Sequence, residues 1–182
     1  MIGEPRFLLQ RLGRHHDRAS FKCTREPTLE RYLTDPGRAN RDNDRHVSAV
    51  YLLVDSASKS RIAGYFTLSN TILVPDAVPV DVAKRLPRYD SWGAVKLGRM
   101  ARDDRYAKLG LGPILLARAF EVALSVSAQS GSFALVVDAK NEQLAAWYVK
   151  HGLRPLPDTP LKLFITNTGM ALILDSMRPV VT

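Results

Sequence analysis

The spacing of apolar residues divides the first half of the chain into short extended and helical segments. Residues 5–10 read as an edge strand, and residues 28–40 place apolar side chains at helical spacing. The charged stretch PGRANRDNDRH overlaps the end of that segment, so any helix there is expected to be broken or exposed. Two β-rich runs, 47–54 and 61–70, then flank the polar turn DSASKS, which is typical of a β-hairpin or meander.

The middle of the chain alternates strand, helix and strand. Residues 80–86 have a helical pattern, and residues 92–102 read as a central strand. Residues 112–129 are apolar around nearly the whole helix, with one narrow polar stripe, which predicts a helix largely buried against a sheet. Residues 133–138 lack polar alternation, as expected of a strand covered on both faces and parallel to the strand before the helix.

The last third completes an α/β pattern. A helix is expected over 141–151, capped by Asn141 and ended by Gly152. The extended stretch LKLFIT follows, and the turn NTG is expected to precede a final strand, MALILDSM. No repeat or linker interrupts the chain, so residues 1–182 are predicted to form one α/β domain, with a mixed, mainly antiparallel sheet flanked by helices.

One stretch, Leu97–Gly112 (LGRMARDDRYAKLGLG), joins the central strand to the apolar helix through a glycine-containing loop. Free N–H groups at a helix N-terminus, together with the positive end of the helix dipole, favour a phosphate or pyrophosphate. Gly110 and Gly112 lack side chains and would let a ligand approach the backbone. An ordinary strand-to-helix turn with two convenient glycines is the alternative.

Composition narrows the class of protein. The 182 residues are 46% hydrophobic and 24% charged, as in a globular domain. No apolar run approaches the ~20 residues that a membrane span needs, and no secretory signal is recognised, so we expect a cytoplasmic protein without membrane contact. The single cysteine, Cys23, and the adjacent His15 and His16 lack metal-ligand spacing, so no metal site is expected. The net charge of +8 favours polyanionic partners.

Two longer motifs carry a family resemblance. RYAKLGLGPILLARA, followed by NEQLAAWYVKHGLRPL, resembles the GNAT acyl-CoA N-acetyltransferases over roughly Val95 to Leu156. Three further segments, FKCTREPTLERYL, IAGYFTLSN and YVKHGLRPLPDTPLKLFI, are similar to the GNAT toxins of bacterial toxin–antitoxin modules. The resemblance implies the GNAT fold and acetyl transfer from acetyl-CoA to the α-amine of aminoacyl-tRNA, which blocks translation. It also implies a ribbon-helix-helix antitoxin and a homodimer.

The resemblance assigns a cofactor site to the central strand, the glycine loop and the following helix. The strand backbone would pair with the pantetheine arm, and the loop amides would hold the pyrophosphate. Two loop positions depart from the family pattern, because Ala107 replaces a Gln or Arg and Lys108 a frequent Gly; Lys108 or Arg105 could supply a side-chain contact instead. The residues expected to bind the cofactor are Met100, Ala101, Arg102, Ala107, Lys108, Leu109, Gly110, Leu111, Gly112 and, apart from its capping role, Asn141.

Tyr148 matches the family's catalytic tyrosine and is the expected general acid for the departing thiolate; a core aromatic beside Trp147 is the alternative. A phenol of pKa ~10 donates to a thiolate of conjugate pKa ~8.5 only in concert with C–S cleavage. The strand 97–101 contains no carboxylate that could act as a base. This absence favours an aminoacyl ester, because an α-amine with a pKa near ~7.7 is already substantially neutral at pH 7.

Four arginines, Arg38, Arg41, Arg45 and Arg99, are expected to contact RNA phosphates, although each alone is typical of a solvated surface. Two other functions fit the same residues. A GNAT enzyme could acetylate a protein or small-molecule amine, and a protein without catalysis could bind CoA or RNA.

Overall fold

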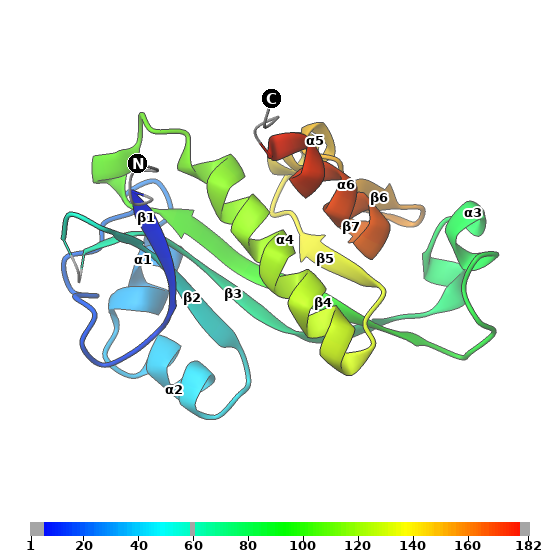
Figure 1. The fold of residues 1–182 in the computed structure, drawn as a ribbon, viewed down its shortest axis with the longest axis horizontal. Coiled ribbons are helices and arrows are strands. Elements are labelled where there is room, and N and C mark those ends of the chain that lie inside the picture. Colours follow the sequence, from blue (N-terminus) through cyan, green and yellow to red (C-terminus); the bar gives the residue numbers. More distant parts are fainter. Residues whose placement is uncertain (1–5, 59–60, 179–182) are drawn as a thin grey trace. The chain divides into compact units, whose positions relative to one another are not determined.

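Residues 6–58 and 61–178 are described by the computed structural model (Figure 1). Pro5 of the predicted edge strand and the last two residues of the DSASKS turn lie outside these ranges. The elements, in chain order, are β1 Phe7–Arg11, α1 Pro27–Thr34, α2 Arg38–Asp44, β2 Ala49–Asp55, β3 Ile62–Leu73, η1 Pro75–Ala77, α3 Val80–Ala83, β4 Trp92–Arg102, η2 Asp104–Tyr106, α4 Leu111–Ser130, β5 Ala134–Asp138, α5 Glu142–Lys150, β6 Arg154–Leu156, β7 Thr159–Thr166 and α6 Asn167–Met177.

The strands follow the order β1-β2-β3-β4-β5-β7-β6 in one mixed sheet. β1 pairs antiparallel with β2, and β2 with β3. β5 and β6 each pair antiparallel with β7, whereas β4 pairs parallel with β5 through Val95–Leu97 and Leu135–Val137. The predicted mixed, mainly antiparallel sheet and its parallel pair are confirmed.

The described residues form two compact units, and β3, β4 and α4 each begin in one and end in the other. Unit 1 comprises the described parts of 1–69 together with 98–118, and unit 2 comprises 70–97 together with the described part of 119–182. The expectation of one domain over 1–182 stays a prediction.

Unit 1 packs helices against both faces of β3. On one face, Tyr65 is buried and donates a hydrogen bond from its hydroxyl to the Leu29 carbonyl oxygen of α1, 2.7 Å away. On the other, a Cβ at Gly64 would lie 2.8 Å from Cδ1 of Leu115 in α4. Successive strand residues point to opposite faces, so Gly64 is where α4 approaches the strand most closely.

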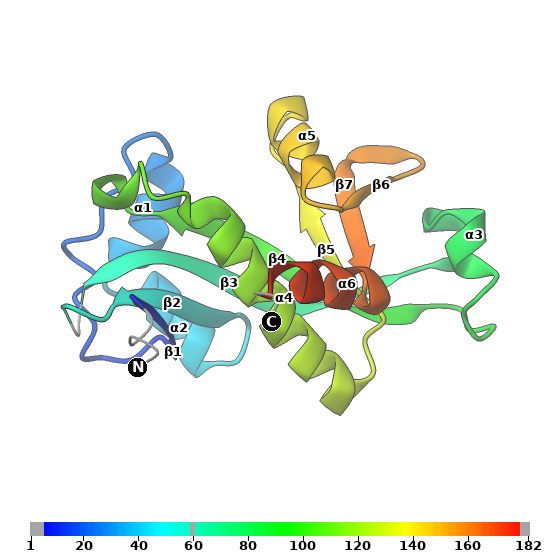
Figure 2. The same ribbon diagram turned by 45° about the horizontal axis from the view of Figure 1, so that its top comes forward.

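Unit 2 is built on β5, β7 and β6, with α5 beside them (Figure 2). Apolar side chains of β4, β5 and β7 pack with those of the α3 segment, and Trp92 meets Phe133 edge to face with ring centroids 5.7 Å apart. The Trp92 indole also donates to the Pro87 carbonyl oxygen, 2.9 Å away, which fixes the loop between α3 and β4.

The final segment contradicts the prediction of a last strand. MALILDSM lies in α6, and the Thr166 hydroxyl caps this helix by accepting a hydrogen bond from the Gly169 N–H. The apolar run is too short to separate strand from helix by periodicity, but Met, Ala and Leu are good helix formers and no β-branched cluster opposes them. NTG is therefore the first turn of a helix and not a hairpin turn.

The expected break before the charged stretch is confirmed. The segment 28–40 is divided between α1 and α2, because α1 ends at Thr34 before the Asp-Pro-Gly sequence.

The prediction for the apolar helix α4 needs correction. In α4, the fully buried positions lie on one face, so the helix is not largely buried as predicted. These buried residues are Leu111, Leu115, Leu116, Ala119, Phe120, Ala123 and Ser127.

The length and apolar composition of α4 also suffice for crossing a membrane. The expectation that no run approaches this length was therefore wrong, since Arg118 and Glu121 are the only two charged residues among the twenty of α4. The buried stripe at helical spacing is equally typical of a core helix.

Gly64→Ala is expected to lower the free energy of unfolding by about 1–3 kcal/mol, since the added methyl would also lie near the fixed Ala101 carbonyl oxygen. Gly37→Ala is the matched control, because its Cβ would meet only the movable Arg41 guanidinium, 3.2 Å away. Urea denaturation checks the pair. Equal stability of the two variants would contradict the close approach of α4 to β3.

Candidate cofactor and acceptor site

The predicted cofactor residues of unit 1 lie on the end of β4 and the loop that leads into α4. Asp103 caps the short helix η2, and residues 107–110 are exposed before α4 begins at Leu111. Gly110 has φ +64°, a left-handed conformation that favours glycine, and open space surrounds the position of a Cβ. The loop therefore presents backbone, unobstructed by side chains, at the start of a twenty-residue helix.

Not every amide of the loop is available to a ligand. The N–H of Ala107 donates to the Asp104 carbonyl oxygen and that of Leu109 to the Tyr106 carbonyl oxygen. The first residues of α4 have no intrahelical acceptor for their N–H groups. Gly110, Leu111 and Gly112 are therefore the better placed of the predicted pyrophosphate-binding residues.

A buried carboxylate holds this loop in place. Asp103 is fully buried and accepts hydrogen bonds from the Lys22 N–H at 2.8 Å and the Arg105 N–H at 2.9 Å. The Arg105 guanidinium adds a bidentate pair, with Nε–Oδ1 and Nη2–Oδ2 both 2.8 Å. Burial alone would raise the pKa of Asp103, but these donors outweigh it and lower the pKa.

Asp104 also joins the loop after β4 to the N-terminal segment around Lys22 and Thr24. Its carboxylate accepts hydrogen bonds from the Thr24 N–H at 2.9 Å and from the Thr24 hydroxyl at 2.8 Å, which lower its pKa. The N–H of Asp104 donates to the Lys22 carbonyl oxygen, 2.8 Å away. The segment FKCT is thus bound to the cofactor loop by backbone and side-chain contacts.

These contacts show which of Arg105 and Lys108 could make the side-chain contact that Ala107 cannot. Arg105 is committed to Asp103, and its Nη2 also donates to the Ser20 carbonyl oxygen at 3.0 Å. Lys108 is exposed and, within 6–58 and 61–178, makes no ion pair. Lys108 is therefore the side chain available to a phosphate, whereas Arg105 has a structural role.

The other two predicted residues, Asn141 and Tyr148, belong to unit 2. The Asn141 side chain caps α5 by accepting a hydrogen bond from the Leu144 N–H, 2.9 Å away, as predicted. Tyr148 is buried on the same helix, and its ring meets Trp147 edge to face at 5.1 Å. Burial raises the pKa of Tyr148 to about 12, so its hydroxyl carries its proton throughout the physiological range.

The four predicted acceptor residues lie on β4 and on or just after α2 in unit 1. Arg38 and Arg41 are exposed on α2, and Arg45 is exposed at the C-cap of that helix. Arg99 is half-buried on β4, and its guanidinium carbon lies 3.9 Å from the centroid of the Tyr32 ring. Arg38 also lies close enough to the Tyr32 hydroxyl to lower its pKa, although burial and Asp42 raise that pKa overall. The structure therefore associates Arg38 and Arg99 with one aromatic residue.

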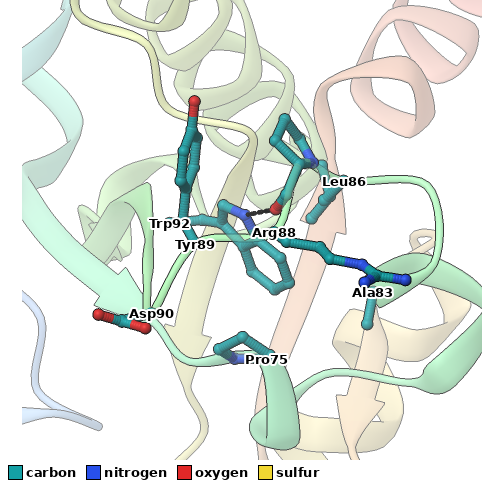
Figure 3. A pocket seen from close by; sticks show the side chains of 8 residues that line it. Pro75, Ala83, Leu86, Arg88, Tyr89, Asp90 and Trp92 are labelled. Atoms are coloured by element: carbon teal, nitrogen blue, oxygen red, sulfur yellow. Dashed lines mark hydrogen bonds between the residues drawn. The ribbon is translucent and has the colours of Figure 1, made fainter.

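A separate cavity of about 260 Å³ lies beside Trp92 in unit 2 (Figure 3). Its walls come from η1, α3 and the loop before β4, and none of the predicted site residues lines it. Within the described ranges, His, Cys, Asp and Glu side chains form no group of three that could hold a metal.

Known proteins resemble this chain along most of its length, although no family model matches it. A probable toxin TacT of Sinorhizobium fredii is 26% identical over 158 residues, which cover 82% of this chain and 84% of that protein. A tRNA-acetylating toxin of Mycobacterium tuberculosis is 27% identical over 167 residues, which cover 91% of this chain and 96% of that protein.

Solved structures agree with these relatives. AtaT complexed with acetyl-methionyl-tRNAfMet superposes with a TM-score of 0.82 at 27% identity, over 92% of this chain and 98% of AtaT. A tyrosine-to-phenylalanine mutant of KacT gives a TM-score of 0.81 at 25% identity, over 93% and 99%. The chain is a homologue of the GNAT toxins. AtaTR bound with acetyl-CoA, another GNAT toxin structure, gives a TM-score of 0.76 at 26% identity, over 92% and 97%.

The sequence predicts most residues of the candidate site but not the residues that hold them in place. The supporting residues are Asp103, Asp104 and Tyr32, for which no role follows from the neighbouring sequence. Their partners are Lys22, Thr24 and Arg99, up to 81 residues away in the chain. The similarity of FKCTREPTLERYL to the toxin group is the one local sign that the N-terminal region contributes to the site.

Asp103→Asn is expected to lower the free energy of unfolding by about 2–3 kcal/mol at pH 7, because a neutral amide with one oxygen cannot accept all of the hydrogen bonds made to the carboxylate and Arg105 loses its ion-pair partner. The folded-state pKa of Asp103 is lowered, so its contribution is present above the unfolded pKa of ~3.9 and is lost as the pH falls through the folded pKa.

Urea denaturation between pH 7 and pH 2 checks this, with Asp90→Asn on the exposed loop before β4 as the control. The difference between the wild type and Asp103→Asn should shrink at the acidic end. A constant difference across the range would mean that the carboxylate charge is not what stabilises the loop.

Proposed function

We propose that the protein is a cytoplasmic toxin that transfers the acetyl group of acetyl-CoA to the α-amine of aminoacyl-tRNA. The observation that carries the proposal is its similarity, over 91% of its length, to a tRNA-acetylating toxin. The AtaT complex with acetyl-methionyl-tRNA, which shares the fold, points to the same reaction. An acetylated α-amine cannot form a peptide bond as a nucleophile, so the modification stops translation.

Acetyl-CoA supplies the activated acyl group, and unit 1 supplies its phosphate site. The amides of Gly110, Leu111 and Gly112 at the start of α4 bind the pyrophosphate, and Lys108 adds the side-chain charge that Ala107 cannot. The backbone of Met100–Arg102 pairs with the pantetheine arm in the manner of an added strand. The Asp103 ion pair supports this function by fixing the loop before a ligand arrives.

The reaction forms a C–N bond and breaks a C–S bond. The neutral α-amine attacks the thioester carbonyl, the ammonium that forms loses a proton to solvent, and the leaving thiolate gains a proton. Tyr148 donates that proton, since burial keeps its hydroxyl protonated near neutral pH, where the α-amine is already substantially neutral. Its deprotonation is uphill from a pKa of about 12, so the transfer is concerted with C–S cleavage.

No base from the cofactor loop takes part. Asp103 and Asp104 both accept several hydrogen bonds and have lowered pKa values, so neither is a useful proton acceptor. An aminoacyl ester needs little help, because its α-amine has a reference pKa of ~7.7 before the ester lowers it further. A lysine acceptor, at ~10.4, would need a base, and the loop carboxylates therefore favour the ester.

The proposal includes two partners. A toxin of this kind needs a neutralising antitoxin, and a ribbon-helix-helix protein is the class that the sequence resemblance implies. A homodimer would present the four acceptor arginines twice, which suits a polyanion as large as tRNA.

Tyr148→Phe is expected to lower the rate of acetyl transfer by about 10²–10⁴-fold, because the thiolate loses its proton donor. Growth arrest on expression of the protein should disappear with it. Purified protein, acetyl-CoA and charged tRNA provide the rate, and thermal protection by acetyl-CoA reports whether the variant still folds and binds the cofactor.

Tyr89→Phe is the matched control, since Tyr89 is exposed beside the separate cavity. A Tyr148→Phe variant as active and as toxic as the wild type would remove Tyr148 from the mechanism. No thermal shift with acetyl-CoA in the wild type would remove the enzyme class altogether.

A further inference from the structure

Arg99 is a half-buried cation without an acidic partner. Its guanidinium lies over the Tyr32 ring, 3.9 Å from the centroid, and no carboxylate within 6–58 and 61–178 forms an ion pair with it. A partly buried charge is unfavourable unless something compensates it. The aromatic face compensates only part of that charge, so Arg99 retains the capacity to bind an anion.

Tyr32 is held rigidly beneath this cation. The ring is buried and stacks on Tyr65, with centroids 6.1 Å apart and an interplanar angle of 24°. The Tyr32 hydroxyl donates to Oδ2 of Asp42 in α2, 2.9 Å away. A phenol that donates to a carboxylate is polarised toward a more electron-rich ring, which strengthens its attraction for a guanidinium.

The surroundings of the ring suit a polyanion. Arg38 is exposed at the start of α2 and its charge acts to lower the pKa of Tyr32; Arg41 lies further along the helix and Arg45 at its C-cap. Arg99 directly precedes Met100–Arg102, the strand residues proposed to pair with the pantetheine arm. The cations therefore extend from α2 to the strand that would hold the thioester.

On the proposed function, on which this step rests, the acceptor is an ester without a free carboxylate. The anions nearest its amine are the phosphodiesters at the 3′ end of the tRNA. We propose that Arg99 binds such a phosphodiester and that Tyr32, fixed by Asp42, is the residue that positions Arg99. Bidentate phosphate recognition needs a guanidinium held in one orientation, which a stacked ring supplies.

The test compares two acceptors that share the amine and the ester. One is charged tRNA, and the other is the methyl ester of the same amino acid, which carries no phosphate. Arg99→Ala is expected to raise KM for charged tRNA by about tenfold or more and to reduce the slope of log KM against log salt by about 1. Activity on the methyl ester and thermal protection by acetyl-CoA should stay unchanged.

Variants of the ring separate positioning from charge. Tyr32→Leu removes the ring and should reproduce most of the Arg99→Ala effect on charged tRNA. Tyr32→Phe keeps the ring and loses only the hydrogen bond to Asp42. Its KM for charged tRNA should therefore lie between that of the wild type and that of Tyr32→Leu. Arg99→Lys keeps the charge but not the planar fork, and its salt slope should match the wild type while its KM rises. If Tyr32→Leu fails to fold, Tyr32→Phe and Arg99→Lys still show whether the orientation of the guanidinium matters beyond its charge.

Arg85→Ala, an exposed arginine of the α3 segment in unit 2, is the control for loss of one positive charge. A wild-type KM and salt slope in Arg99→Ala would overturn this inference alone, as would an equal loss on both acceptors. A wild-type protein that acetylates the methyl ester but no charged tRNA would overturn the proposed function, and this inference with it.

Discussion

The ion pair between Asp103 and Arg105 is the constraint on which the candidate site depends. Its carboxylate is fully buried, and it also accepts the Lys22 N–H, so one side chain joins the end of β4 to the N-terminal segment. Asp104 repeats the connection through Thr24. Residues 107–110 of this loop are exposed, so none of their own side chains is buried to hold them. Buried charge-assisted hydrogen bonds fix the loop instead, which leaves the amides at the start of α4 oriented before any ligand binds.

The residues proposed to bind the acceptor are likewise held in place by other side chains. Side chains that would meet substrate are exposed or half-buried cations, and the groups that orient them are buried and polar. Arg99 is supported by Tyr32, Tyr32 by Asp42, and Tyr65, on which Tyr32 stacks, by the Leu29 carbonyl oxygen. In unit 1, the residues proposed to bind the acceptor are therefore near the surface, and buried aromatic rings and hydrogen-bonded carboxylates fix their geometry.

Sequence patterns among neighbouring residues were enough to predict many of the secondary-structure elements. The strand over 92–102, the Asn141 cap and the hairpin runs each follow from neighbouring residues, and the structure confirms them. The prediction of a strand over MALILDSM was wrong because a short apolar run fits a strand or a helix. The Thr166 cap and the burial of Met170 are the features that favour the helix α6. The contacts that hold the site in place could not be predicted from the sequence, because each joins residues far apart in the chain. These contacts are Lys22–Asp103, Thr24–Asp104 and Tyr32–Arg99. Spacing identifies a residue's chemistry, but not the partner that sets its pKa or fixes its position.

On the proposed function, the acetyl group passes from acetyl-CoA to the α-amine of an amino acid attached to tRNA. This transfer is tested by incubating the wild-type protein with isotopically labelled acetyl-CoA and charged tRNA, digesting the RNA and identifying the aminoacyl-adenosine by mass spectrometry. We expect labelled N-acetyl-aminoacyl-adenosine, formed only when acetyl-CoA is present. Label found solely on protein lysines, or unmodified aminoacyl-adenosine beside consumed acetyl-CoA, would contradict the proposed function.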